Sequence, residues 1–141
     1  MNDEQHTGPV VRVKHPFMAA SAERVFDAFL DPAIARQFLF ATPEGTMLRA
    51  EVDPRVGGRF CFVEGRAQGD AEHHGTYRVI ERPRRLVFSF SLDAAVEGDE
   101  VSIEITPDPA GGCRLQLTHR MRPEWAEYAD RTQDGWTKIL E

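Results

Sequence analysis

The sequence predicts an α+β domain in which a curved antiparallel sheet is covered by helices. Three observations support this class: helical apolar spacing near the start, an alternating apolar pattern through the middle, and a second helical stripe at the end. The chain has 141 residues, which suits one domain with a sizeable core and leaves no room for a second. We expect a flexible tail over residues 1–9 and a single domain over residues 10–141.

The first predicted elements are a strand over residues 10–18 and two short helices in tandem. Ser21 is suited to cap the first helix, because serine is a preferred N-cap and apolar residues follow at helical spacing. Asp31 and Pro32 restart the pattern as N-cap and first helical residue, so we expect a second helix through about Phe38.

The apolar period then changes to two, which is typical of strands with one buried face. The expected strands cover residues 47–52, 59–64, 75–81, 86–92, 101–106 and 113–121. Connections are predicted at residues 69–74 and at the glycine pair 111–112. Pro123 and Glu124 are expected to open a helix that runs to the end of the chain, with Trp125, Ala129, Thr132, Trp136 and Ile139 on its apolar stripe.

Charge and composition argue against several classes of function. The net charge is −6, whereas a duplex-binding surface needs a basic stripe, and the basic run at residues 82–85 is expected to be a hairpin end. No apolar run approaches the ~20 residues of a spanning helix. The polar start lacks the features of a signal peptide. We therefore expect a cytoplasmic protein that binds neither nucleic acid nor membrane, and a homodimer is left open.

No motif points to catalysis, a metal or a cofactor. Phosphate loops and nucleophile elbows are absent, and Cys61 and Cys113 lie in strand-like runs where buried thiols are expected. His73 and His74 lie close to two acidic residues, but adjacent strand residues point to opposite faces, which favours an exposed polar hairpin over a metal site. Of the two, His74 is expected to lean inward, because it adjoins the strand that carries Tyr77.

Aromatic residues gather on the predicted inner face of the sheet. The chain contains nine phenylalanines, and His119 shares a face with Leu115 and Leu117. Two interpretations stay open: a filled core with a satisfied histidine, or an apolar pocket in which His119 orients a ligand. The candidate ligand-binding residues are Phe38, Phe60, Phe62, Tyr77, Phe88, Phe90, Ile103, Leu117, His119 and Trp136.

Several motifs, in this order, resemble those of one family. They are Ser21 to Phe29 with Asp31-Pro32, Asp53 to Phe60, Gly75 to Ile80 with Pro83 to Phe88, Leu115 to His119, and Gly135-Trp136. Together they are similar to the activator of heat-shock-protein-90 ATPase homologue (AHSA-type) family of the START-like, SRPBCC superfamily. The chain departs from this family in having Phe26 and Phe38 where Trp is usual. It also stops soon after Trp136, which would leave one end of the cavity more open.

The resemblance implies a helix-grip, Bet-v-like fold: a sheet of six or seven strands around a long C-terminal helix, with a cavity for apolar ligands. It implies no single activity. The leading hypothesis is a small apolar or aromatic ligand held between sheet and C-terminal helix, without catalysis. One alternative is a polyketide cyclase or aromatase-like enzyme with His119 or Tyr77 as acid or base. The least favoured alternative is a stress-response domain that binds a chaperone.

Overall fold

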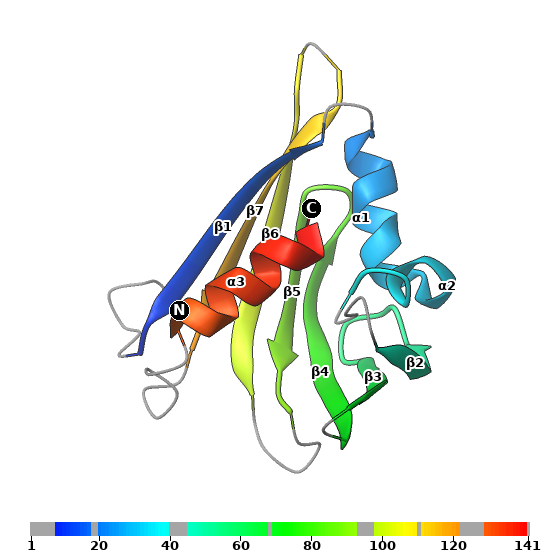
Figure 1. Cartoon of the computed structure of the whole chain (residues 1–141). Helices are drawn as coiled ribbons and strands as arrows, with labels where there is room; N and C mark the ends of the chain where they lie inside the picture. Colours follow the sequence, from blue (N-terminus) through cyan, green and yellow to red (C-terminus); the bar gives the residue numbers. More distant parts are fainter. Residues whose placement is uncertain are drawn as a thin grey trace.

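The computed structural model describes residues 8–17, 20–39, 45–67, 69–92, 98–109, 111–121 and 129–140. The elements are β1 (Val10–Phe17), α1 (Ala22–Leu30), α2 (Pro32–Ala35), β2 (Thr46–Val52), β3 (Arg59–Arg66), β4 (Gly69–Glu81), β5 (Arg85–Phe90), β6 (Asp99–Pro107), β7 (Cys113–Arg120) and α3 (Ala129–Leu140). The strands form one antiparallel sheet in the order β1-β7-β6-β5-β4-β3-β2. The sheet is curved, and α1 and α3 pack into the core on its inner side (Figure 1). The predicted α+β class is confirmed.

Both short helices begin where the sequence predicts. The Ser21 hydroxyl accepts a hydrogen bond from the backbone of the first turn of α1 at 3.2 Å. The Asp31 carboxylate does the same for α2 at 3.0 Å. Helix α2 ends at Ala35 rather than near Phe38, and a turn carries the chain on to Leu39. The local capping groups therefore set where the helices begin.

Strand β4 departs most from the predicted elements. Residues 69–74, expected to form a connection, are the first half of this 13-residue strand and pair with β3. Their polar, glycine-containing composition is typical of a turn. Pairing with β3 nevertheless satisfies their backbone N–H and C=O groups, and this pairing does not depend on the kind of side chain. The basic run at residues 82–85 lies at the β4–β5 turn, as predicted. There the Arg82 guanidinium donates two hydrogen bonds to the Asp27 carboxylate of α1, at 2.7 and 2.8 Å.

Alternation sorts the side chains of the central strands into a buried inner face and a more polar outer face, as predicted. Seven side chains on the inner face of β6 and β7 are at most 3 % exposed; they are Val101, Ile103, Ile105, Cys113, Leu115, Leu117 and His119. Two expectations were wrong. The strand expected over residues 86–92 ends at Phe90 in β5, and Leu92, beyond its end, is 65 % exposed. Cys61 is a half-buried free thiol on the outer face, whereas the free thiol of Cys113 is buried.

Helix α3 closes part of the inner face near β1 (Figure 1). It spans 12 residues, with Trp136 and Leu140 buried. The expected start at Pro123–Glu124, and Trp125, lie outside the described residues. What is described is thus a short helix instead of the long one that the resemblance implies. No helix among the described residues is both long and apolar enough to span a membrane.

Candidate functional site

The predicted ligand-binding residues all belong to one core or pack against it. Eight of them are buried, while Phe38 and Phe90 are partly buried at its margin. Two groups can be distinguished in the sheet register, in which the buried Val101 of β6 lies opposite Phe88 of β5 on one side and opposite His119 of β7 on the other. One group lies beneath α1 and the turn after α2, and the other lies beside α3. The structure therefore supplies two separate places at which a function could reside.

A small pocket lies beneath α1 and the turn after α2, against the inner face of β3, β4 and β5. Its volume is about 10 Å³, roughly the space of one water molecule. The lining residues are Phe29, Leu39, Phe60, Tyr77, Leu86 and Phe88. Three of these were predicted from strand alternation. Phe29 and Leu39 were missed, because the way the helix region docks onto the sheet has no local sequence signal. Leu86 was also missed, although it alternates with Phe88 on the same strand.

Phe60 is the central ring of this pocket. Its centroid lies 5.3 Å from that of Phe88, edge to face at 89°, and 5.5 Å from that of Tyr77. These distances are in the favourable range for aromatic pairs. Gly75 makes the packing of Phe60 possible, because a Cβ atom at this position would lie only 2.3 Å from the ring. Phe38 packs edge to face on Phe29 at 5.4 Å, so it supports the lining without belonging to it.

Tyr77 is the polar residue of the pocket. The residue as a whole is only 3 % exposed. Its hydroxyl makes no hydrogen bond with any residue that the structure describes, and since no polar side-chain atom among those residues is both buried and unpartnered, the hydroxyl oxygen reaches solvent. Burial raises the pKa of the Tyr77 hydroxyl well above its usual range, and the charge of Asp53 adds to the effect. The hydroxyl therefore keeps its proton at neutral pH and presents a hydrogen-bond donor.

His119 lies in the second group, where two partners hold its ring. The Nε2–H group donates to Asp99 Oδ2 at 2.9 Å, and Nδ1 accepts the Trp136 indole N–H at 3.0 Å. Because the indole can only donate, Nδ1 carries the lone pair. Phe90 packs against both rings, with centroid distances of 5.6 and 6.3 Å. Both ring nitrogens are thus engaged within the protein, as in the first interpretation of His119.

Asp99 was absent from the predicted site, although the sequence carried a signal for it. Strand β6 alternates from Val101 through Ile103 on the inner face, and continuing that alternation backwards places Asp99 on the same face. Val101 lies directly opposite His119 in the β6–β7 pair. Asp99, two residues before Val101 on β6, is therefore the diagonal neighbour of His119 on the same face. The hairpin register would therefore have identified the carboxylate that pairs with His119.

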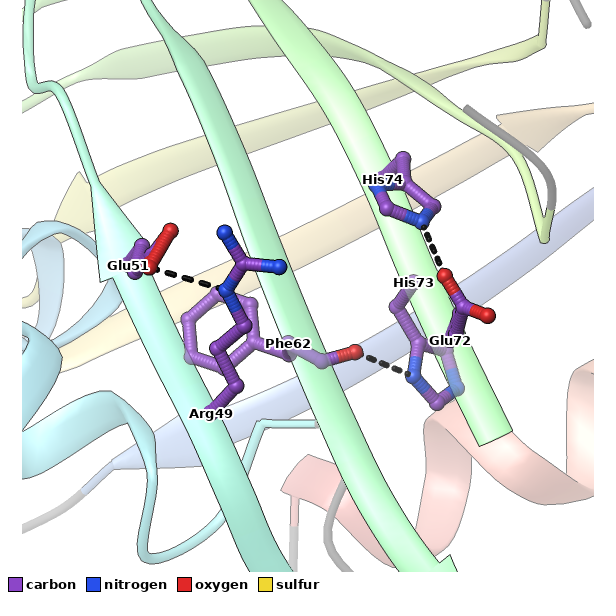
Figure 2. Close-up of polar contacts among 6 residues, drawn as sticks. All are labelled: Arg49, Glu51, Phe62, Glu72, His73 and His74. Atoms are coloured by element: carbon purple, nitrogen blue, oxygen red, sulfur yellow. Dashed lines mark hydrogen bonds and ion pairs between the residues drawn. The ribbon is translucent and has the colours of Figure 1, made fainter. Parts of the chain in front are cut away.

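His73, and not His74, faces the interior, contrary to the prediction. It is 6 % exposed, lies opposite Phe62, and donates from Nδ1 to the Phe62 carbonyl oxygen at 3.2 Å (Figure 2). His74 lies on the outer face, where it contacts Glu72 at 3.0 Å. Residues 69–74 belong to the same strand as Tyr77, whose side chain faces the interior. Side chains alternate along a strand, so the side chain of His73, four residues before Tyr77, lies on the inner face as well. Among the described residues, no three metal-ligating side chains come together.

Lowering the pH is expected to destabilise the protein through His73. Burial lowers the pKa of this histidine from 6.5 to about 4, with smaller opposing effects from its bond to the Phe62 carbonyl and from Glu64, while Arg66 and His74 lower it further. The unfolded chain binds the proton with its ordinary pKa. The contribution of His73 is therefore complete above about pH 6.5 and is lost as the pH falls towards about 4, a change of roughly 3 kcal/mol.

Urea unfolding of the wild type and of His73→Gln, between about pH 7 and about pH 4.5, measures this effect. Glutamine retains a donor for the Phe62 carbonyl but does not titrate. Between these two pH values the variant should lose about 2.5 kcal/mol less stability than the wild type. Identical pH dependence in the two proteins would show that His73 is not the buried neutral group described here.

The curved antiparallel sheet with helices on its inner side is a helix-grip fold. Residues 19–141 match the family described as Activator of Hsp90 ATPase homolog 1-like protein. The chain belongs to this family, which confirms the resemblance carried by its motifs.

Solved structures show the same fold. An AHSA1-like protein from Aeromonas hydrophila is 25 % identical with a TM-score of 0.77, over 94 % of this chain and 87 % of that one. A protein from Chromobacterium violaceum is 23 % identical with a TM-score of 0.80, over 93 % and 91 %. An HSP90 activator from Plasmodium falciparum is 22 % identical with a TM-score of 0.70, over 94 % and 91 %. No curated protein matches the chain.

Proposed function

We propose that this protein binds a small, flat aromatic or apolar ligand that carries a hydrogen-bond acceptor, beneath α1 and the turn after α2. The observation that carries the proposal is Tyr77, which lines the pocket among apolar side chains and whose protonated hydroxyl has no hydrogen-bond partner among the described residues. Small-molecule sites typically combine an apolar lining with a few polar groups that orient the ligand.

The pocket has to widen to admit an aromatic ring, since about 10 Å³ suits a single water. In this proposal the pocket widens by an outward shift of α1 and α2, while the sheet stays in place. The helix side of the pocket is tethered to the sheet by the exposed Asp27–Arg82 pair and by a 3.1 Å hydrogen bond from Arg36 to the Met47 carbonyl. Exposed ion pairs contribute at most about 1 kcal/mol, so a small outward shift of α1 and α2 loses little from these tethers.

Titration with quinoline, a flat aromatic molecule with one acceptor nitrogen, tests the proposal. Methyl-labelled leucines provide the readout by NMR. Leu39 and Leu86 line the pocket, whereas Leu48 and Leu92 are 58 % and 65 % exposed elsewhere and serve as internal controls. We expect saturable shifts at Leu39 and Leu86 with little change at the controls. Shifts of equal size at all four, or no saturation, would contradict the proposal.

The enzymatic alternative needs a group that transfers a proton beside the ligand. His119 could do so only by giving up its bond to Asp99 or to Trp136. Tyr77, with its raised pKa, is suited to donate a hydrogen bond and not to act as a base. These contacts favour a binding role for the two residues.

Chaperone binding is the second candidate function, and it rests on the family description and on the likeness to an HSP90 activator. Isothermal titration of this protein with the host's Hsp90 separates the two candidates. Binding of the chaperone by a protein that fails to respond to quinoline would favour this second function. A quinoline response without chaperone binding would favour the first.

A further inference from the structure

We propose that β2 is a self-association surface, through which two copies pair antiparallel about a two-fold axis at Ala50 and join their sheets into one. Strand β2 is the last strand of the sheet, at the edge opposite β1. An edge strand offers unpaired backbone groups to another strand. The direction of the backbone groups and the extent of the open edge show where a second strand can pair on residues 49–52, and the order of the charges favours another copy of this chain.

The backbone of β2 points its free groups outward at alternate residues. The N–H group of Asp53 donates to the residue opposite it on β3 at 3.0 Å. Hydrogen-bonded pairs alternate along an antiparallel ladder, so Glu51 and Arg49 also bond to β3. The N–H and C=O groups of Ala50 and Val52 consequently point away from β3. Within the described part of the chain, no strand or loop pairs with them.

The start of β2 is not part of this surface. The Arg36 guanidinium donates to the Met47 carbonyl oxygen at 3.1 Å and so covers the first residues of the strand. A bulge between Met47 and Arg49 leaves Leu48 outside the ladder and 58 % exposed. Bulges interrupt pairing, so the edge that is open to a second strand begins at Arg49 and is short. We therefore expect a weak, reversible dimer.

The charges on this stretch are self-complementary. Arg49 and Glu51 lie on the outer face, 2.8 Å apart and each 56 % exposed (Figure 2). In an antiparallel pair centred on Ala50, Arg49 of one copy faces Glu51 of the other, and the reverse pair forms by symmetry. Ala50 then faces its own counterpart and exchanges two backbone hydrogen bonds with it, using the groups that point outward. Opposite charges across strands are favourable and like charges are not.

Sedimentation velocity over a concentration series, at low and high salt, tests this pairing. We expect the wild type to dimerise reversibly and more weakly as salt increases. Arg49→Glu places Glu against Glu in both symmetric pairs, so the dissociation constant should rise about tenfold. The charge swap R49E/E51R restores opposite charges and should recover the wild-type value. Ala50→Pro removes the two central N–H donors without touching the β2–β3 ladder, and it should also weaken the dimer about tenfold or more.

Arg55→Glu is the matched charge control, because Arg55 forms a similar exposed pair with Asp53 at 2.8 Å, outside residues 49–52. It should leave the dissociation constant unchanged, and circular dichroism should show that every variant is folded. The proposal is overturned if the wild type stays monomeric at high concentration. It is also overturned if the charge swap fails to recover association, or if Arg55→Glu weakens it as much as Arg49→Glu.

Discussion

Replacing Gly75 with alanine is expected to lower the free energy of unfolding by about 3 kcal/mol, as measured by urea denaturation. The added Cβ would lie 2.0 Å from the backbone oxygen of Ser89 and 2.3 Å from the Phe60 ring. The oxygen belongs to β5, which is paired to β4 and to β6 and cannot easily move. Phe60 would therefore be pushed into the pocket that it lines, and quinoline binding should be lost as well.

Gly65→Ala is the control for this substitution. Gly65 lies in β3, and its added Cβ would be close to the Leu48 side chain, at 3.3 Å, and in ordinary contact with Asp70 Oδ1, at 3.7 Å. The Leu48 side chain is exposed and can move away, so the free energy of unfolding should change by no more than about 0.5 kcal/mol. Equal losses in the two variants would mean that the close approach of Phe60 to Gly75 is not what makes this position sensitive.

The Phe88→Ala variant should be less stable than the wild type by about 3–5 kcal/mol and should bind quinoline more tightly. Phe88 is 2 % exposed, and its ring forms one wall of the pocket. Removing the ring enlarges the existing space, and dry apolar cavities of sufficient size bind small aromatic molecules. Quinoline should therefore restore part of the lost stability, which denaturation with and without the ligand would measure. Phe88→Leu should change both quantities in the same direction by less.

Phe62→Ala separates the role of the pocket from a general effect of core truncation. Phe62 is fully buried on the same inner face, but it does not line the pocket. We expect a similar loss of stability without a gain in quinoline affinity. If both variants bound quinoline more tightly, or neither did, the ligand would not occupy the space beside Phe88.

Most of the fold could be predicted because its signals are local. Ser21 and Asp31 cap their helices through contacts within three residues. Alternation placed the buried residues of β6 and β7 correctly, since a strand repeats every two residues whatever its partner. The first half of β4 could not be predicted in this way. Its residues are polar, and only pairing with β3, a tertiary contact, makes them a strand.

The candidate site could be predicted only in part for the same reason. Strand alternation placed Phe60, Tyr77 and Phe88 on the inner face, but it could not show that Phe29 closes the space above them. Strand alternation also could not show which of the buried polar side chains has its hydrogen bonds satisfied by the protein. The sequence made His119 the polar candidate, yet its two partners come from β6 and α3. Whether a buried polar group is satisfied depends on such distant elements.

Comparing quinoline with naphthalene on the wild type and on Tyr77→Phe tests the ligand-binding proposal most directly. Naphthalene has the same shape as quinoline but lacks the acceptor nitrogen. Loss of one hydrogen bond should weaken quinoline about fivefold in the variant, while the affinity for naphthalene stays the same. Stability should also be unchanged, because the Tyr77 hydroxyl has no partner among the described residues. Equal quinoline affinities in the two proteins would contradict the role given to Tyr77.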